Sequence, residues 1–176
     1  MDDISDFVLA FTVMQATLDH YCLLVGRLMS ETAAIGTNCD GVIALDRGLP
    51  SGAYADLPIE IVSMHFREKV ERVGDIAARQ HGELHPATQH LRTTALRVAD
   101  LRNLVAHGHI ETGSPRDGTV TVVHSPRKSG YTETEINLQE LEQAIDDSKT
   151  VAAHAVFVWS NLPGSPGSGL TLEELE

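Results

Sequence analysis

An arginine, an asparagine and two histidines lie within the eight positions from Arg102 to His109. If residues 102–107 are helical, Asn103 and His107 are four apart and share one face, which the long side chain of Arg102 also reaches. A guanidinium can hold phosphate oxygens with two parallel hydrogen bonds, and an imidazole can transfer protons near neutral pH. These residue types at this spacing therefore indicate phosphodiester chemistry.

The helix that would present these residues is expected over residues 86–107. Pro86 is placed for its first turn, and Gly108 is placed as a C′ residue just beyond its end. His107 in the last turn also suits the negative end of the helix dipole. The simplest alternative is thus a structural role, with Arg102 in a salt bridge and His107 favoured by the dipole.

The six residues Arg102-Asn103-Leu104-Val105-Ala106-His107 resemble the signature of the HEPN superfamily. In that signature an arginine, usually followed by a polar residue, is separated from a histidine by about four to six residues. The resemblance implies a small helical homodimer that cuts RNA without a metal or other cofactor, as in toxin–antitoxin and defence systems. It also implies that two copies of the motif meet across the dimer interface, and that an antitoxin or another regulatory protein is a further partner.

The resemblance implies catalytic roles for Arg102, Asn103 and His107. RNA carries its own nucleophile, the 2′-hydroxyl, so a histidine can accelerate cleavage as base or acid, and an arginine stabilises charge that develops on the phosphate. Asn103 would orient the phosphate or the histidine, and the products would be a cyclic phosphate and a free 5′-hydroxyl. His107 leaves four residues after Arg102 and His109 leaves six, so His109 is the alternative catalytic histidine.

Charge and composition limit the function classes. A chain of 176 residues with 42% hydrophobic content can bury a core of its own, while its net charge of −12 argues against a general nucleic-acid coat. A local basic site remains compatible with that charge, and Arg97, Arg127 and Lys128 are its candidate substrate-binding cations. The acidic balance equally suits a non-catalytic HEPN-like module that binds a partner protein or a nucleotide. A plain helical dimer without a site is the third alternative.

No metal site, membrane span or disulfide is expected. A glycine and a proline interrupt any single helix that could carry His81, His85 and His90, and no cysteine or carboxylate cluster joins them. Cys22 lies in an apolar helical pattern and is expected to be a buried thiol. The sequence opens acidic and no apolar run approaches membrane length, so we expect a cytoplasmic protein without membrane contact.

Periodicity and turn residues predict a mainly α fold: an up-down bundle of about four long helices, with a small antiparallel β hairpin or sheet before the last helix. Helices are expected over residues 4–32, 59–82, 86–107 and 137–162, and short strands over 109–112, 119–124 and 131–136. Glycines and prolines predict a loop over residues 36–57. Residues 1–163 then form one domain with its β insertion at about 109–136, followed by a flexible acidic tail, 164–176.

Two local patterns refine this outline. Apolar residues from Ile4 to Leu28 recur at spacings of three and four, so the first helix either lies deep in the bundle or is covered on a second side by a partner chain. Asn137, followed three positions later by Glu140, predicts a capping box at the start of the last helix.

Overall fold

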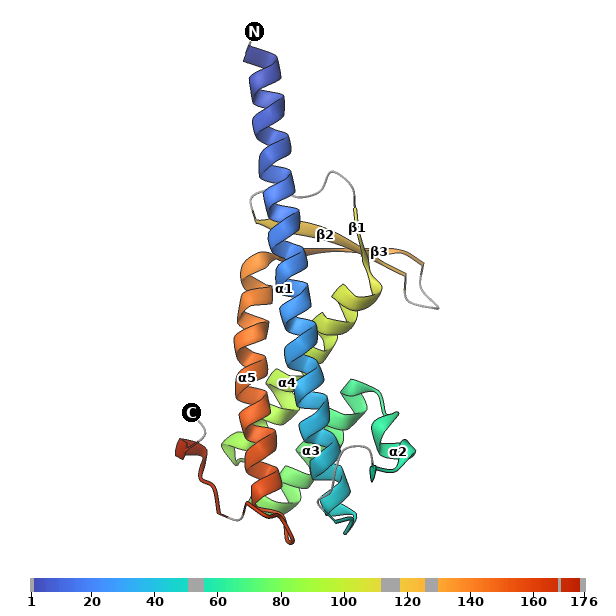
Figure 1. Ribbon diagram of the computed structural model, residues 1–176, viewed down its shortest axis with the longest axis vertical. Helices are drawn as coiled ribbons and strands as arrows, with labels where there is room; N and C mark the ends of the chain where they lie inside the picture. The colour runs from blue at the N-terminus through green and yellow to red at the C-terminus, as the bar shows by residue number, and fades with distance from the viewer. Residues whose placement is uncertain (1, 51–55, 112–117, 126–129, 168, 175–176) are drawn as a thin grey trace. The chain divides into compact units, whose positions relative to one another are not determined.

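The computed structural model describes residues 2–50, 56–111, 118–125, 130–167 and 169–174. Its elements in chain order are α1 (Asp2–Asp46), α2 (Ile59–Val62), α3 (Phe66–His81), α4 (Pro86–His107), β1 (His109–Ile110), β2 (Thr119–His124), β3 (Thr132–Asn137), α5 (Leu138–Ser160) and the 3-10 helix η2 (Leu172–Glu174). The predicted fold class is confirmed, because the protein is mainly helical and a small antiparallel sheet precedes the last long helix (Figure 1).

The chain divides into two compact units. Unit 1 comprises Met1–Met29 and Leu101–Ile145, and unit 2 comprises Ser30–Asp100 and Asp146–Glu176. The chain passes from one unit to the other within α1, α4 and α5, so each unit is built from segments that are distant in the sequence. The end of α4, which carries the predicted site, belongs to unit 1.

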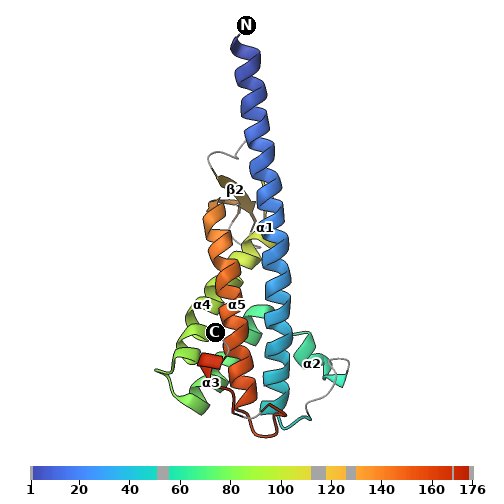
Figure 2. The same ribbon diagram turned by 60° about the vertical axis from the view of Figure 1, so that its left-hand side comes forward.

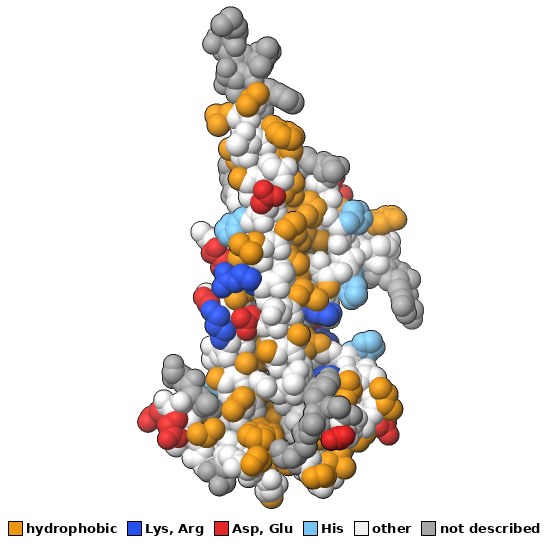
Figure 3. All heavy atoms as spheres, in the orientation of Figure 1, with side chains coloured by type: hydrophobic (Ala, Val, Ile, Leu, Met, Phe, Trp, Pro, Cys, Tyr) orange, Lys and Arg blue, Asp and Glu red, His pale blue; other side chains and the backbone are white. Residues whose placement is uncertain are grey.

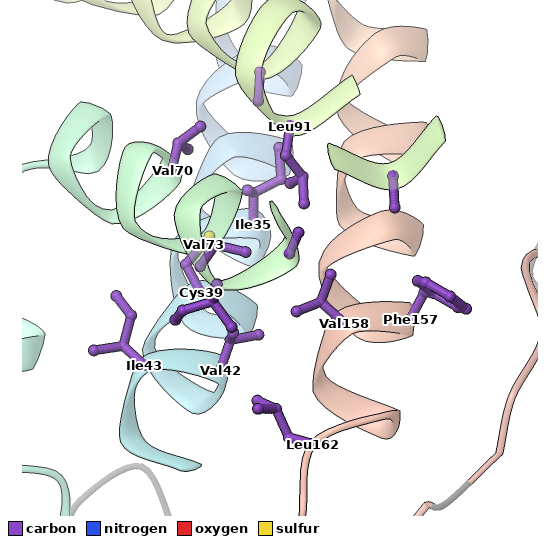
Figure 4. Packing of buried hydrophobic residues seen from close by; sticks show 14 of the residues in the cluster. Ile35, Cys39, Val42, Ile43, Val70, Val73, Leu91, Phe157, Val158 and Leu162 are labelled. Carbon is purple, nitrogen blue, oxygen red and sulfur yellow. The ribbon is translucent and has the colours of Figure 1, made fainter. Parts of the chain in front are cut away.

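Long helices supply most of the hydrophobic core of unit 2 (Figure 4). The labelled core residues are Ile35, Cys39, Val42 and Ile43 from α1, Val70 and Val73 from α3, Leu91 from α4, and Phe157 and Val158 from α5, with Leu162 just beyond it. Each fully buried aliphatic side chain contributes about 1.5–3 kcal/mol relative to an exposed one. Burial, with a further contribution from Asp40 that Lys69 opposes, raises the pKa of the Cys39 thiol to about 12. That thiol is therefore protonated and unreactive near neutral pH.

The predicted loop over residues 36–57 is wrong for its first half, because α1 continues to Asp46 through Gly36 and Gly41. Each glycine costs a helix interior about 1 kcal/mol relative to alanine. Burial of the neighbouring Cys39, Val42 and Ile43 offsets that cost. Packing therefore overrides the local signal of the glycines, and residues 51–55 of the predicted loop lie outside the described residues.

The predicted helix over residues 59–82 is two helices, α2 and α3, which are separated at residues 63–65. A buried lysine makes contacts at this break. The Nζ atom of Lys69 lies 2.8 Å from both carboxylate oxygens of the fully buried Asp40 and donates a hydrogen bond of 3.0 Å to the carbonyl of Val62. Lys69 thus donates a hydrogen bond to a backbone carbonyl at the end of α2, and it also forms an ion pair with a carboxylate of α1.

Removing this lysine should destabilise unit 2 far more than removing an exposed one. We expect Lys69→Met to lower the free energy of unfolding by about 3–5 kcal/mol, because the carboxyl group of Asp40 is left buried without its cation. The matched control is Lys149→Met, whose lysine forms an exposed i,i+3 pair with Asp146 and should change stability by less than about 1 kcal/mol. Urea unfolding of both variants measures the difference, and equal effects would contradict this role for Lys69.

The sheet of unit 1 has the order β1-β2-β3, with antiparallel neighbours. β2 and β3 pair from Thr119 opposite Asn137 to His124 opposite Thr132. α5 follows β3 directly, and the predicted capping box at its start is confirmed. The amide of Gln139 donates to Asn137 Oδ1 at 2.9 Å, and the amide of Asn137 donates to Glu140 Oε2 at 3.3 Å. The sheet and the last helix are therefore joined without an intervening loop.

The N-terminal part of α1 is exposed over several turns. In both ribbon views its first turns extend beyond the sheet of unit 1, with no other described element of that unit beside them (Figure 2). Its exposed apolar side chains are Val8, Leu9, Phe11, Val13 and Leu23, whereas Tyr21, Leu24 and Leu28 are buried. Cys22 is also exposed, which corrects the expectation of a buried thiol, because it points away from the side of α1 that packs within unit 1. Hydrophobic side chains are visible along this helix in Figure 3.

Within α1, the segment Val8–Asp46 contains an 18-residue window with a mean hydropathy of 1.4, of which 17% is buried. By length and composition this helix could cross a membrane, which corrects the expectation that no apolar run approaches that length. Core helices of soluble proteins and signal sequences share these properties. Length and composition alone therefore assign no membrane location.

Leu170 and Leu172 of the C-terminal segment contact other parts of unit 2. Leu172, in η2, packs against the hydrophobic core. Asn161 Nδ2 donates a hydrogen bond of 3.3 Å to the carbonyl of Leu170. Residues 168 and 175–176 of the tail lie outside the described residues.

Candidate functional site

The predicted site lies at the C-terminal end of α4. This helix has the bounds that the sequence predicted, Pro86–His107. Asn103 and His107 are therefore helical and four positions apart, on one face. The helix ends when the amide of Gly108 donates to the carbonyl of Leu104 at 2.8 Å, and β1 begins at the next residue, His109. One glycine thus connects the helix that carries Arg102 to the first strand of the sheet.

Gly108 is required for a reason other than the predicted one. Its φ is not in the left-handed region, so it is not the left-handed C′ residue that the sequence suggested. A Cβ atom at this position would lie 2.2 Å from Val122 Cγ1 and 2.8 Å from the carbonyl oxygen of Leu104. Glycine is needed because the end of α4 lies directly against β2, where no side chain fits.

The guanidinium of Arg102 differs from most of its counterparts. Arg102 is half-buried, and its Nη1 donates a hydrogen bond of 3.1 Å to Asn103 Oδ1. No carboxylate in the described part of the chain forms an ion pair with it. By contrast, five arginines pair with carboxylates: Arg67, Arg72, Arg79, Arg92 and Arg97. The salt-bridge role considered for Arg102 is therefore absent from the described contacts.

Both candidate catalytic histidines are exposed. His107 ends α4 on the same face as Asn103, whereas His109 lies in β1 opposite Val123. A side chain on the helix moves with Arg102 and Asn103 as one rigid element, and a side chain on the strand is fixed by the sheet. The helical spacing of α4 therefore places His107 on the same face as Asn103. His109, in β1, is the alternative histidine.

The predicted substrate-binding cations are not brought to the motif by the described contacts. Arg97 belongs to unit 2, where its guanidinium forms an ion pair with Asp147. Arg127 and Lys128 lie outside the described residues. The described site therefore consists of Arg102, Asn103 and the two histidines.

A second group of titratable side chains lies in unit 2. We call it the histidine cluster, and it consists of His81 from α3, His85 from the turn before α4, His90 from α4, and His154 from α5. The sequence pointed to the first three, but His154 was missed because it lies far along the chain. A lone histidine in the otherwise uncharged stretch from Thr150 to Ser160 is the signal that could have found it.

Within the described residues, no group of three or more His, Cys, Asp or Glu side chains is arranged to hold a metal ion. No protein-family model, curated protein or solved structure matches this chain. Any functional assignment therefore rests on the residues at the end of α4 and on their contacts.

The close approach at Gly108 makes a testable claim about stability. We expect Gly108→Ala to lower the free energy of unfolding by about 1–3 kcal/mol, because its Cβ would overlap Val122 and a backbone carbonyl. Gly26→Ala is the matched control in the same unit, since nothing lies within 4 Å of its Cβ position inside α1. That control should stabilise the protein by roughly 0.5–1 kcal/mol. Urea unfolding would contradict the packing of α4 on β2 if Gly108→Ala were as stable as the unmodified protein.

Proposed function

We propose that the protein is a metal-independent endoribonuclease of HEPN type, with a composite active site at the interface of a homodimer. Arg102, Asn103 and His107 are its catalytic residues, and His109 is the alternative histidine. The observation that carries the proposal is the guanidinium of Arg102, which has the neighbouring amide of Asn103 as its partner and no carboxylate among the described residues. A cation held in this way is available to a phosphate.

The chemistry follows from these side chains. Arg102 binds the scissile phosphate and stabilises the negative charge that builds on its oxygens as the 2′-hydroxyl attacks. Asn103, through its hydrogen bond, limits the positions of the guanidinium. His107 removes the proton of the 2′-hydroxyl or protonates the leaving 5′-oxygen, and either step is suited to an imidazole near neutral pH. The bond from phosphorus to the 5′-oxygen breaks as the bond to the 2′-oxygen forms.

A second copy of the chain would complete the site. One motif supplies one helical histidine, so pairing two motifs allows one His107 to act as base and the other as acid. The exposed apolar residues of α1 support association, because Leu9 is 64% exposed and Leu23 is 61% exposed in unit 1. Exposed apolar surface of this kind marks interaction sites in soluble proteins.

The net charge favours one alternative function. With 25 acidic and 13 basic residues, the chain repels nucleic acid outside any local site. A non-catalytic HEPN-like module that binds a regulatory protein, such as a basic antitoxin, or a nucleotide would use the same unpaired guanidinium for binding alone. Tight binding without RNA cleavage would select this alternative.

Arg102 provides the first test. In the presence of a chelator, the unmodified protein should cut single-stranded RNA, and Arg102→Ala should lower the rate on the order of 100-fold or more, because charge on the phosphate loses its stabilising cation. The matched control is Arg72→Ala, which removes an exposed guanidinium paired with Glu68 on α3 and should leave the rate unchanged. Cleavage that a chelator abolishes, or equal rates in the two variants, would contradict the proposal.

The two histidines can be separated in the same assay. We expect His107→Ala to lose cleavage by a factor on the order of 100 or more, since general acid–base catalysis contributes that much. We expect His109→Ala to retain most activity, because its side chain lies in β1 rather than on the helical face of Asn103. Retention of activity in His107→Ala with loss in His109→Ala would transfer the catalytic role to His109.

A further inference from the structure

The histidine cluster of unit 2 consists of two pairs of histidine rings, with contact between the two rings of each pair. The ring centroids of His81 and His85 are 4.9 Å apart, and both rings contact Phe157, at 4.9 and 5.4 Å respectively. His90 and His154 form a second pair, with centroids 4.7 Å apart and an edge-to-face arrangement. Phe157 and Val158 project in different directions from α5, so one helix contacts both the cluster and the core (Figure 4).

Three imidazole nitrogens of the cluster are buried without a hydrogen-bond partner: His81 Nε2, His90 Nε2 and His154 Nδ1. In the fourth histidine, Nδ1 of His85 accepts a hydrogen bond of 3.2 Å from the amide of Ala87 in the first turn of α4. In that bond the lone pair of Nδ1 is the acceptor. The cluster is thus packed in a form that suits uncharged rings.

The charged groups on the surrounding elements are engaged elsewhere. Arg79 of α3 pairs with Asp46, and Glu83 in the turn before α4 pairs with Arg92. α5 carries no Asp, Glu, Lys or Arg from Thr150 to Ser160. No ion pair in the described part of the chain joins a carboxylate to the cluster. Protons added here therefore place like charges about 5 Å apart without a counter-ion.

One aromatic contact can accommodate charge. A protonated His85 could interact favourably with the face of Phe157, on which it is stacked. His90 and His154, among the described ring contacts, contact only each other. We therefore expect protonation to weaken the contact between His90 and His154 most, and this contact joins α4 to α5.

We propose that the histidine cluster is an acid-sensitive switch, which holds α5 against α3 and α4 of unit 2 while its rings are neutral and releases α5 when they are protonated. The switch involves none of the residues of the proposed ribonuclease site. It therefore stands or falls independently of RNA cleavage.

The direction of the pH effect follows from the burial of two rings. Burial, followed by the charges of His90 and His85, lowers the pKa of His154 from 6.5 to about 4. Burial, followed by the charge of His85, also lowers the pKa of His81. The unfolded chain then binds more protons than the folded chain between pH 6.5 and about 4, so stability is full above this window and falls as the pH falls through it. For His154 alone, the folding equilibrium constant should fall on the order of 100-fold.

The only tryptophan of the chain reports on this unit. Trp159 lies in α5, and its ring is 3.7 Å from the Cβ position of Gly41 in α1, which is also in unit 2. Urea unfolding of the full chain, followed by the fluorescence of Trp159 at pH 7.5 and pH 4.5, therefore measures how firmly α5 is held. The test compares the unmodified protein with His154→Leu and with His65→Leu, a matched control at an exposed histidine of unit 2.

The unmodified protein and His65→Leu should lose stability alike between the two pH values. His154→Leu should lose less, by a factor on the order of 100 in its folding constant. Equal losses in all three proteins would overturn the switch.

NMR titration of the unmodified protein gives a test that does not require the variant to fold. Rings of the cluster that take up protons near pH 6.5 while Trp159 keeps its native signal would overturn the proposal. Stabilisation of the unmodified protein by Zn²⁺ at pH 7.5, absent in His154→Leu, would also overturn it in favour of a metal site.

Discussion

The contact between Gly108 and Val122 is the constraint on which the candidate site depends. A Cβ on residue 108 would lie 2.2 Å from the side chain of Val122, so the backbone at the end of α4 can rest on β2 only because that Cβ is missing. The same contact fixes where the helix stops and where β1 starts. It sets the end of α4, which carries Asn103 and His107, against the central strand of the sheet. The close packing of Gly108 on Val122 thereby also positions Asn103 and His107, although neither side chain takes part in that contact.

Electrostatics distinguishes this turn from the rest of the described protein. Elsewhere, carboxylates neutralise most of the described arginines, and Lys69 neutralises Asp40 in a buried pair. Such pairing is expected in a chain with about twice as many acidic as basic residues. The described ion pairs do not include the exposed Arg27 and Arg47 either, but Arg102 differs from these two because it is half-buried and its described partner is a neutral amide. We propose that, in a protein of net charge −12, this half-buried guanidinium offers a local site for an anion, and its fork of N–H donors suits a phosphate.

Much of the fold could be predicted from the sequence because its signals are local. Pro86 marks the start of α4, alternating β-branched residues mark β2, and the pair Asn137 and Glu140 marks the start of α5. The failures depend on contacts between distant residues. Gly36 and Gly41 indicate a loop, but burial of α1 against α3 and α5 keeps them helical. The break between α2 and α3 lies where Lys69 contacts Asp40 and Val62. The placement of Arg102, Asn103 and His107 at the end of one helix could be predicted from the sequence. The lack of a described carboxylate beside Arg102 and the contact of His154 with His90 required the tertiary structure.

Binding of an RNA analogue that cannot be cut tests the central claim most directly, because it separates recognition of the phosphate from catalysis. A single-stranded oligonucleotide with 2′-deoxy sugars would be titrated into the full-length protein at low salt, while NMR follows the arginine side-chain N–H and imidazole C–H resonances. The account predicts that the signals of Arg102 and His107 shift together and saturate together, while those of Arg72 and His65 stay in place. Unchanged signals of Arg102 and His107 at saturating oligonucleotide, or uniform small shifts of all arginines, would contradict it.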